Sequence, residues 1–512
     1  MIGAGAVGWT RRLMHDLLKV PEFADLHYAL TDISEQNLSM AYQLCEKDVK
    51  ANGLPTKISQ TTDRRAATKD ADYVICAIRQ GGLEAFKTDI DIPLKYGIDQ
   101  CVGDTICAGG IMYAQRTIHA LLEFCRDIRE VAKPGAILLN YANPMAMNTW
   151  ACNKYGGVKT IGLCHGVQGA HWQITRAIEQ WAKKEKLIGE DEKLHRRDVD
   201  VIAAGLNHQT WFTKIQWRGM DIVPRLYEMM SAVEDFQKQE KVRLDVLKRF
   251  GYYSTESNGH LSEYLPWYRK RTGEINQWID LSSWINGETG GYLRICTEGR
   301  NWFETDFPNW MKSPAPVIAE QNRSEEHGSY IIEGLETGRV YRGFFNVPNQ
   351  NHITNLPNEV IVEIPGYVDR NGISMPVVGD LPLACAATCS ASARVQQMGM
   401  EAAVHGNVEL LKQAMLHDPL VGAVCNPEEV WQMTDEMLVA QAQWLPQYTH
   451  NGSVKAAAKR LSDHVRAGTR VRTVETQGVA RIHTKTVAEM QKNKEEHRAM
   501  AAASDKGKMT KV

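Results

Sequence analysis

The sequence lacks any apolar run near the about 18 residues that a membrane-spanning helix requires. It also lacks a basic and then apolar leader, because the N-terminus passes directly into a glycine motif. Charge of either sign is not in excess: 59 Lys and Arg residues face 61 Asp and Glu residues, for a formal net charge of -2. We therefore expect no membrane partner and no nucleic-acid partner.

Cysteine is present but not in the pattern of a secreted protein. The 11 cysteines are an odd number, spread from Cys45 to Cys425 without a CxxC pair. This distribution favours a reducing compartment, so we predict a cytoplasmic protein. What the chain does have is 512 residues of which 43% are hydrophobic, enough for a globular protein of two or more domains.

The first part of the chain alternates short β-rich runs with amphipathic stretches, as in the βαβ units of a parallel sheet. Helices are predicted at Thr10–Val20 and Tyr113–Ala132. Predicted strands are Leu26–Thr31, Tyr73–Ala77, Ala136–Tyr141 and Thr160–Cys164. The fold class is therefore α/β, with a Rossmann-type dinucleotide-binding domain over residues 1–200.

The pattern of predicted strands and helices changes after about residue 200. Strands such as Val199–Ala203 and Val360–Ile364 mix with long helices, which predicts an α+β domain for substrate and metal over residues 201–451. The stretch 452–512 is rich in Ala, Lys, Arg and Gln and predicts a helical C-terminal extension with a disordered tip.

A glycine loop opens the chain. Gly3, Gly5 and Gly8 have the GxGxxG spacing, which allows a tight turn and close approach of a pyrophosphate, and Asp32 follows the next strand where a carboxylate can bind ribose hydroxyls. The combination favours NAD over NADP. Only Met1 and Ile2 precede the motif, so either upstream residues are missing or the first strand is stunted. A glycine turn that binds nothing is the alternative.

Several polar residues fall where predicted strands end. Arg79 follows one strand and is a candidate for the cofactor crevice, or an ordinary loop residue. Cys164 and His165 follow another, and Asn207-His208 follows a third. One thiolate and one imidazole, from Cys164 and His208, can hold a divalent metal with positions open for substrate. Taken alone, a buried Cys and a hydrogen-bonded His are the commoner interpretation.

Several short motifs, in this order along the chain, resemble glycoside hydrolase family 4, and the similarity spans about residues 2 to 450. They are Asn143-Pro144, Cys164-His165-Gly166-Val167, Gly205-Leu206-Asn207-His208, Gly259-His260-Leu261-Ser262-Glu263-Tyr264 with Pro266-Trp267, and Asn346-Val347-Pro348-Asn349 leading to Asn355-Leu356-Pro357. The resemblance is strongest to the melibiase-type α-galactosidases. It implies an NAD-dependent O-glycosyl hydrolase that uses Mn(II) or another divalent metal.

In that family, the resemblance implies, NAD oxidises the sugar C3 hydroxyl to a ketone, which acidifies the hydrogen on C2. The C1 substituent is then eliminated, water adds, and the same nicotinamide reduces the ketone. This route is an exception to the two-carboxylate mechanism of most glycosidases. The sequence thus favours a metal held by Cys164 and His208, although thiolate and imidazole alone suit Zn or Fe as well as Mn.

Three catalytic roles are implied by the resemblance. Tyr264 matches the base that removes the C2 proton, His165 matches the position of the general acid, and Asp104 matches an acidic position near the metal. Asn143, Asn207 and His165 are the expected substrate contacts, with Asn143 also facing the nicotinamide. The alternatives are a packed aromatic for Tyr264 and an exposed loop residue for Asp104.

The sugar is less well defined than the chemistry. Branches acting on 6-phosphorylated sugars follow the metal cysteine with Asp or Asn and then Pro, so an unphosphorylated α-glycoside is implied, an α-galactoside first. Gly166 departs from the usual Cys-His-Ser-Val. We expect the missing serine side chain to leave space for a bulkier C6 group, which keeps α-glucuronide, α-galacturonide and α-glucoside open as substrates. Candidate readers of a carboxylate are Arg269, Lys270, Arg294 and Arg300.

Two other classes of protein stay open. Glu326-His327-Gly328 has the local context of the catalytic histidine of lactate- or malate-type dehydrogenases, or it is the charged start of a helix at Tyr330–Leu335. A catalytically silent NAD-binding protein is the second. The family tends to form dimers or tetramers, so we expect a homo-oligomer with a small oligosaccharide or glycoside as substrate.

Overall fold

The computed structural model describes residues 1–279, 287–469 and 481–494. Its first part is the predicted parallel sheet, with β1 paired to β2 and β3 to β4 to β5. Ile2 forms parallel bridges to both Thr31 and Cys76, so one residue stands where the first strand is expected. These strands are β1 (His27–Leu30), β2 (Lys57–Gln60), β3 (Tyr73–Cys76), β4 (Ile137–Asn140) and β5 (Thr160–Gly162).

Helices connect these strands, as the predicted βαβ pattern requires. They are α1 (Val7–Leu18), α2 (Glu35–Ala51), α3 (Arg64–Thr68), α4 (Gly82–Lys95), α5 (Cys107–Val131), α6 (Met145–Ala151) and α7 (Gly166–Lys184). Helix α5 begins at Cys107, six residues earlier than predicted. Gly109 and Gly110 are poor helix formers, which is why the sequence predicted a later start. A Cβ on Gly110 would lie 2.5 Å from the Thr105 carbonyl carbon, so close packing requires glycine there despite its low helix propensity.

The second part of the chain continues the same sheet. The strand order is β3-β4-β5-β10-β11-β6-β7-β8, and β10 pairs antiparallel with β5 through Asn346 and Gly162. The strands are β6 (Val199–Leu206), β7 (Gln209–Trp217), β8 (Met220–Asp221), β9 (Tyr253–Ser254), β10 (Tyr341–Pro348), β11 (Ile361–Asp369) and β12 (Gly372–Ser374). Strands β3 to β5 thus share one ten-stranded sheet with the antiparallel strands, while β1 and β2 form a separate two-stranded sheet. The domain boundary at residue 200 stays a prediction.

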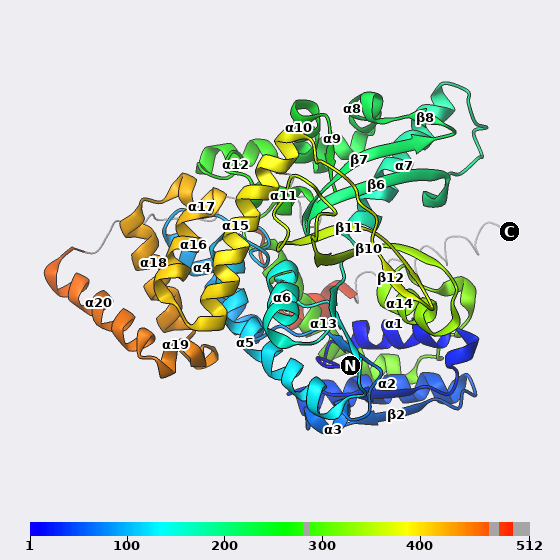
Figure 1. The fold of residues 1–512 in the computed structure, drawn as a ribbon, viewed down its shortest axis with the longest axis horizontal. Helices are drawn as coiled ribbons and strands as arrows, with labels where there is room; N and C mark the ends of the chain where they lie inside the picture. The colour runs from blue at the N-terminus through cyan, green and yellow to red at the C-terminus, as the bar shows by residue number, and fades with distance from the viewer. Residues whose placement is uncertain (280–286, 470–480, 495–512) are drawn as a thin grey trace.

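The remaining helices follow α7 in the chain, and several of them pack against α4 and α5 of the first half (Figure 1). They are α8 (Leu226–Ser231), α9 (Glu234–Gln239), α10 (Lys241–Phe250), α11 (Asn258–Tyr264), α12 (Thr272–Trp278), α13 (Gly291–Lys312), α14 (His327–Thr337), α15 (Leu383–His405), α16 (Val408–His417), α17 (Pro419–Val424), α18 (Pro427–Ala440), α19 (Pro446–His450) and α20 (Ser453–Ala467). The predicted helix at Tyr330–Leu335 is confirmed within α14. None of the helices in the described ranges is long and apolar enough to span a membrane.

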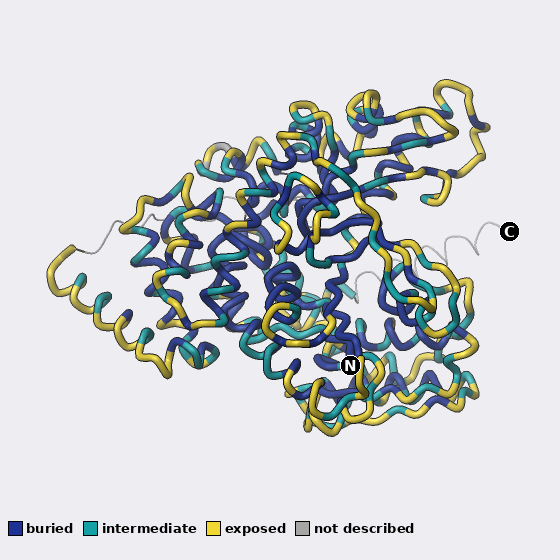
Figure 2. The backbone as a smooth tube through the Cα atoms, viewed as in Figure 1, coloured by how far each residue is buried: buried dark blue, intermediate teal, exposed yellow. Residues whose placement is uncertain are grey.

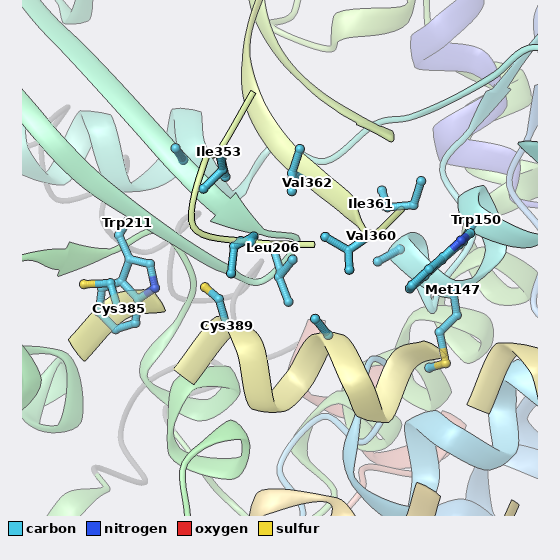
Figure 3. Packing of buried hydrophobic residues seen from close by; sticks show 14 of the residues in the cluster. Met147, Trp150, Leu206, Trp211, Ile353, Val360, Ile361, Val362, Cys385 and Cys389 are labelled. Atoms are coloured by element: carbon cyan, nitrogen blue, oxygen red, sulfur yellow. The ribbon is translucent and has the colours of Figure 1, made fainter. Parts of the chain in front are cut away.

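The largest core cluster joins the sheet to α15 and α6. Leu206 and Trp211 from the β6–β7 hairpin lie beside Cys385 and Cys389 of α15, with Trp150 of α6 at the other end of the cluster (Figure 3). Buried backbone is continuous through the centre, whereas exposed backbone concentrates on the outer turns and on α20 (Figure 2). This packing fixes the hairpin whose tip carries the predicted metal histidine.

The predicted C-terminal extension begins with helix α20. After it, the described segment 481–494 lies against α13 and α4: Arg481 pairs with Asp91 at 2.8 Å, the Lys485 amide donates to Glu298 at 3.0 Å, and Lys494 pairs with Asp306. The predicted disordered tip, at Lys506–Val512, lies outside the described residues. The three-part division of the chain stays a prediction.

Candidate functional site

The glycine loop forms a tight cradle between β1 and β3. A Cβ on Gly3, whose φ is +85°, would lie 2.4 Å from the Ala77 carbonyl oxygen, and a Cβ on Gly5 would lie 2.7 Å from Asp32 Oδ2. The Gly5 amide donates to the same Asp32 oxygen at 2.8 Å. A Cβ on Gly8 would meet Phe303 at 2.9 Å. All three glycines are therefore required for close packing, as the spacing predicts.

Helix α1 follows this cradle with its N-terminus open. Within the described chain, no side chain caps its first turn. Uncapped N–H groups at a helix N-terminus are the usual binding site of a phosphate group. Asp32 is held in place by the Gly5 amide and by the Ser34 amide, which donates to Oδ1 at 2.8 Å. Its remaining lone pairs are free to accept bonds from a ribose.

The predicted metal pair comes together at the carboxyl edge of the sheet. Cys164 follows β5 and immediately precedes α7, whose Gly166 amide donates to Sγ at 3.4 Å. His208 lies in the two-residue turn between β6 and β7, with φ at +64°. Burial raises the pKa of the Cys164 thiol well above its ordinary value. A nearby cation is therefore required before the thiolate forms.

A third donor, Glu256, joins this pair. Its Oε1 lies 3.6 Å from Cys164 Sγ and 3.8 Å from His208 Nε2, and one ligand atom from each of the three lies within 4.8 Å of the others. Neighbouring histidines, His208 first, hold the pKa of Glu256 below its ordinary value, against the effect of its burial. The sequence analysis missed Glu256. Its position, an acidic residue three residues before the Gly259–Tyr264 motif, is the sequence signal that could have indicated it.

Thr105 fixes the orientation of His208. Its hydroxyl donates to Asp104 Oδ1 at 3.0 Å and lies 2.6 Å from His208 Nδ1. Because the single hydroxyl proton goes to Asp104, Thr105 accepts from His208 Nδ1–H. The lone pair of His208 is thereby placed on Nε2, the nitrogen that faces Glu256. This is the arrangement by which second partners orient metal-binding imidazoles.

Asp104 is the centre of a hydrogen-bond network, not an exposed loop residue. It is 1% exposed, and its Oδ2 accepts from Asn143 Nδ2 at 2.9 Å and lies 3.8 Å from Arg79 Nη2. Arg79 packs over the rings of Phe86 and Tyr113, and its Nη1 has no partner among the described residues. Arg79 and Asn143 thus reach the same carboxylate beside the metal pair. Their binding of cofactor and substrate stays a prediction.

His260 is a second residue that the sequence analysis quoted without giving it a role. Its Nε2 lies 3.9 Å from Asp104 Oδ1, its Nδ1 lies 3.6 Å from Glu256 Oε2, and its ring is 4.6 Å from that of His208. Burial, with the adjacent His208, lowers the pKa of His260 to about 4. His260 is therefore neutral at physiological pH, with Nδ1 2.8 Å from the Ser257 hydroxyl, and stands between the two carboxylates without adding charge.

Tyr264 ends helix α11 and its hydroxyl is buried. The residue is 1% exposed, and no described residue forms a hydrogen bond with its hydroxyl. Its ring lies 5.8 Å from that of His260. Burial, with Glu263 and Asp104 nearby, raises the pKa of Tyr264 well above its ordinary value. The phenol is therefore protonated in this environment and becomes a base only when a nearby cation lowers its pKa.

His165 and Asn207 differ in exposure. The His165 side chain is 68% exposed, with Glu326 Oε1 at 3.8 Å from Nδ1 and the Trp9 ring at 6.4 Å. Asn207 is 1% exposed, and both of its side-chain polar atoms lack partners in the described part of the chain. One is placed at the open side of the site and the other inside it, as a general acid and a substrate contact require. Neither role is tested by the geometry alone.

One sequence-based expectation about substrate recognition is wrong, and the candidate readers of a carboxylate stay predictions. Gly166 does not leave open space, because a Cβ there would lie 1.7 Å from Glu256 Oε1. Three of the proposed carboxylate readers are already paired: Arg269 with Asp99, Arg294 with Glu288, and Arg300 with Glu84. Gly166 leaves room for the Glu256 carboxylate of the protein itself, and the three arginines form ion pairs within the protein.

His327 is the residue that suggested a hydroxy-acid dehydrogenase. It is 1% exposed, bonds to Tyr341 through Nδ1 at 2.6 Å and lies 2.7 Å from Gln168 through Nε2. Burial lowers its pKa to about 3. A histidine with both nitrogens occupied inside the core does not act as an acid or base on a substrate.

Glu263 holds the loop that carries Asp104. Its carboxylate accepts from the amides of Cys101, Val102 and Gly103 at 2.8, 3.1 and 3.0 Å. Burial raises its pKa to about 7.

We expect Glu263→Gln to lower the free energy of unfolding by about 1 to 3 kcal/mol, because the amide NH₂ faces a backbone N–H that loses its acceptor. Urea denaturation measures the change. Glu234→Gln, at a position whose side chain is 82% exposed, is the matched control and should change stability by no more than about 0.5 kcal/mol. Equal stability of wild type and Glu263→Gln contradicts this role.

Comparison with known proteins places this geometry in a family. Two family models match, Family 4 glycosyl hydrolase over residues 1–180 and Family 4 glycosyl hydrolase C-terminal domain over residues 203–421. The chain is 55% identical to an α-galactosidase of Rhizobium meliloti over 505 residues, which covers 98% of each chain. It is 32% identical to an α-galactosidase of Bacillus subtilis over 87% of this chain and 98% of the relative.

More distant relatives share the whole fold. An α-galacturonidase of Lachnoclostridium phytofermentans is 26% identical over 87% of this chain and 96% of its own length. The solved structure of lplD from Bacillus subtilis, described as a glucosidase, is 26% identical with a TM-score of 0.74, covering 85% of this chain and 98% of that one. A 6-phospho-β-glucosidase from Thermotoga maritima has a TM-score of 0.67 at 22% identity, covering 86% and 98%.

Proposed function

This chain belongs to glycosyl hydrolase family 4, and we propose that it hydrolyses an unphosphorylated α-galactoside through transient oxidation of the sugar at C3. The observation that carries the proposal is the 55% identity to an α-galactosidase across 98% of both chains. The site supports it independently, because its residues fit both a dinucleotide and a divalent metal.

The residues fit NAD. Gly3 and Gly5 leave no room for a Cβ beside Ala77 and Asp32, and the first turn of α1 has no side-chain cap among the described residues. Asp32 is fixed with lone pairs to spare for ribose hydroxyls, which favours NAD because a 2′-phosphate would be repelled. When bound, NAD supplies a hydride acceptor for the sugar C3–H and returns the hydride at the end of the cycle.

The residues also fit a divalent metal. Cys164 and His208 present a sulfur and a nitrogen with its lone pair free, within 4.8 Å of each other. When bound, the metal supplies a Lewis acid that stabilises negative charge on the sugar oxygens. The structure of the Thermotoga maritima relative contains manganese and NAD⁺, and we propose that this chain uses the same two groups.

The remaining residues carry the proton transfers. Tyr264 takes the C2 proton as a phenolate, which forms once a bound cation offsets the burial that raises the pKa of its hydroxyl and the phenol proton has passed to solvent. His165, at the exposed side of the site, protonates the departing glycosidic oxygen as an imidazolium. Asn143, held by Asp104, and Asn207, with unpaired amide atoms, orient the sugar hydroxyls.

Of the sugars that the sequence leaves open, a galactoside is favoured over a uronide. The relative with the α-galacturonidase name keeps the uronide as the second candidate. However, the space expected beside Gly166 is occupied by the Glu256 carboxylate. A second carboxylate in that space would be repelled, and three candidate arginines are already paired.

A substrate panel tests the proposal. Aryl α-galactoside, α-glucoside, α-glucuronide and α-galacturonide are assayed in deuterium oxide with NAD, Mn(II) and thiol. We expect the galactoside to have the highest kcat/KM, and we expect deuterium at C2 of the released galactose because the C2 proton exchanges with solvent. Removing NAD and adding EDTA should abolish hydrolysis.

Other outcomes of the panel lead to other conclusions. Hydrolysis that continues unchanged without NAD and metal excludes the oxidative route. A higher kcat/KM for the galacturonide changes the assigned substrate to a uronide and leaves the proposed mechanism unchanged. Tight NAD binding with no glycoside turned over identifies a catalytically silent protein, and net NADH production from a 2-hydroxy acid identifies a dehydrogenase.

We propose a cytoplasmic location, supported by the fact that all 11 cysteines are free. We also propose a homo-oligomer, dimer or tetramer. Size-exclusion chromatography with light scattering determines the assembly.

A further inference from the structure

Glu256 is a buried carboxylate for which the family resemblance provides no role. It stands between β9 and α11, with its side chain 12% exposed. It faces three polar groups of the site, Cys164 at 3.6 Å, His208 at 3.8 Å and His260 at 3.6 Å, and a Cβ at the Gly166 position would overlap it. A carboxylate that forms this many contacts in a protected position needs an explanation beyond packing.

The distances from Glu256 to the other two donors are those of ligands around one cation, and all three donors lie within 4.8 Å of one another. A tetrahedral metal with bonds of about 2.0 to 2.3 Å separates its ligand atoms by about 3.3 to 3.8 Å. Glu256 Oε1 lies 3.6 Å from the sulfur and 3.8 Å from the Nε2 that carries the His208 lone pair. Without a cation, the Cys164 thiol donates to Glu256 Oε1, whereas the thiolate that a metal requires is compatible with this carboxylate only when the cation lies between them.

We propose that Glu256 is a third protein ligand of the divalent metal, and that Gly166 is retained because any side chain there would displace the Glu256 carboxylate. The proposal rests on the proposed function, which supplies the metal at Cys164 and His208. Gly166 is the first residue of α7 and its φ lies outside the left-handed region, so its backbone does not require glycine. Glycine is required because a Cβ at this position would lie 1.7 Å from Glu256 Oε1.

A third, oxygen ligand also changes the chemistry of the site. Thiolate and imidazole favour Zn or Fe, whereas carboxylate oxygen suits harder ions such as Mn(II). Two anionic ligands, Cys164 and Glu256, balance the two positive charges of the ion. The departure of Gly166 from the usual serine thus goes together with a harder, more negative ligand set.

Mn(II) binding to metal-stripped, NAD-saturated enzyme tests the inference. Isothermal titration gives the dissociation constant, and electron paramagnetic resonance reports the ligands of bound Mn(II). We expect Glu256→Gln to raise the Mn(II) dissociation constant at least about 10-fold and to change the resonance spectrum. Gly166→Ala should have the same effect. The double variant should bind no more weakly than the weaker single variant, because both changes remove the same ligand.

Gly169→Ala is the matched control in the same helix. A Cβ at Gly169 meets nothing within 4 Å, so we expect wild-type Mn(II) affinity. NAD titration and thermal melting, performed on every variant, distinguish a lost ligand from a damaged fold. A weakened Mn(II) site in an enzyme with unchanged NAD affinity and melting temperature supports the inference.

The opposite results overturn it. If Glu256→Gln binds Mn(II) as tightly as wild type while Cys164→Ser does not, the metal site stands and Glu256 is not a ligand. If Glu256→Gln keeps its Mn(II) affinity and shows only a raised KM for the galactoside, Glu256 contacts the sugar and does not bind the metal. If Cys164→Ser also keeps wild-type Mn(II) affinity, the metal assignment of the proposed function fails together with the inference.

Discussion

Cys164→Ser should lower kcat/KM for an aryl α-galactoside by at least about a thousandfold. Sulfur is the softest of the donors at the carboxyl edge of the sheet, and its thiolate forms only when a cation offsets the burial that raises its pKa. A metal that stabilises developing charge on sugar oxygens contributes several kcal/mol, and about 4 kcal/mol corresponds to about a thousandfold in rate. Steady-state kinetics with saturating NAD and Mn(II) measures the loss, and metal analysis of the purified variant should find less Mn(II).

Cys45→Ala provides the control for loss of a thiol. Cys45 is fully buried in α2, away from the metal pair, and burial raises its pKa to about 12. We expect this variant to lose stability but to keep kcat/KM within about twofold of wild type, since a cavity in the core acts on folding. Wild-type activity and metal content in Cys164→Ser would remove the thiolate from the site.

The parallel half of the fold is predictable because its signals are local. The strand predictions at Tyr73–Ala77 and Ala136–Tyr141 agree with β3 and β4 to within one residue at each end. Each is a short apolar run between polar segments, which periodicity detects. The continuation of the sheet into β10 and β11 was not predictable, because Asn346 meets Gly162 across 184 residues of sequence and no local pattern encodes that pairing.

The site divides in the same way. Cys164, His208, Asp104 and Asn143 lie at strand ends or in sequence motifs, and they do converge. Glu256 and Thr105 were missed because their roles exist only in three dimensions: one completes a donor set from a different loop, and the other determines which imidazole nitrogen keeps its lone pair. Gly166 was noticed, but the sequence could not show that a protein carboxylate fills the space beside it.

Tyr264→Phe should lower kcat by about 100-fold to 10,000-fold, the range that general acid–base groups contribute. The change removes one oxygen and leaves the ring in place. Because no described residue forms a hydrogen bond with that hydroxyl, the fold loses no bond, and we expect a melting temperature equal to or slightly above that of wild type. Incorporation of solvent deuterium at C2 should slow in proportion to kcat, and a kinetic isotope effect with C2-deuterated substrate should increase.

Tyr448→Phe gives the opposite pattern and is therefore the control. The single proton of the Tyr448 hydroxyl is shared between two acceptors, Gln115 Oε1 at 2.7 Å and the Ala402 carbonyl oxygen at 2.9 Å, in a different core cluster. Its loss should cost about 1 kcal/mol of stability without changing kcat. Loss of kcat without loss of stability is the result that separates a base from a packed aromatic.

Full activity in Tyr264→Phe would contradict the assignment of the base and would indicate which group to test next. His260 is the nearest alternative, with its ring 5.8 Å from that of Tyr264 and a pKa that burial lowers to about 4. A neutral imidazole can accept a proton at physiological pH, but its low pKa makes it a weak base. A C2 proton acidified by the adjacent ketone is itself more easily removed than an ordinary C–H. Deuterium incorporation at C2 is therefore compared in Tyr264→Phe and His260→Gln. The comparison decides between Tyr264, a strong base that must first ionise, and His260, a weak base whose neutral ring can accept a proton directly.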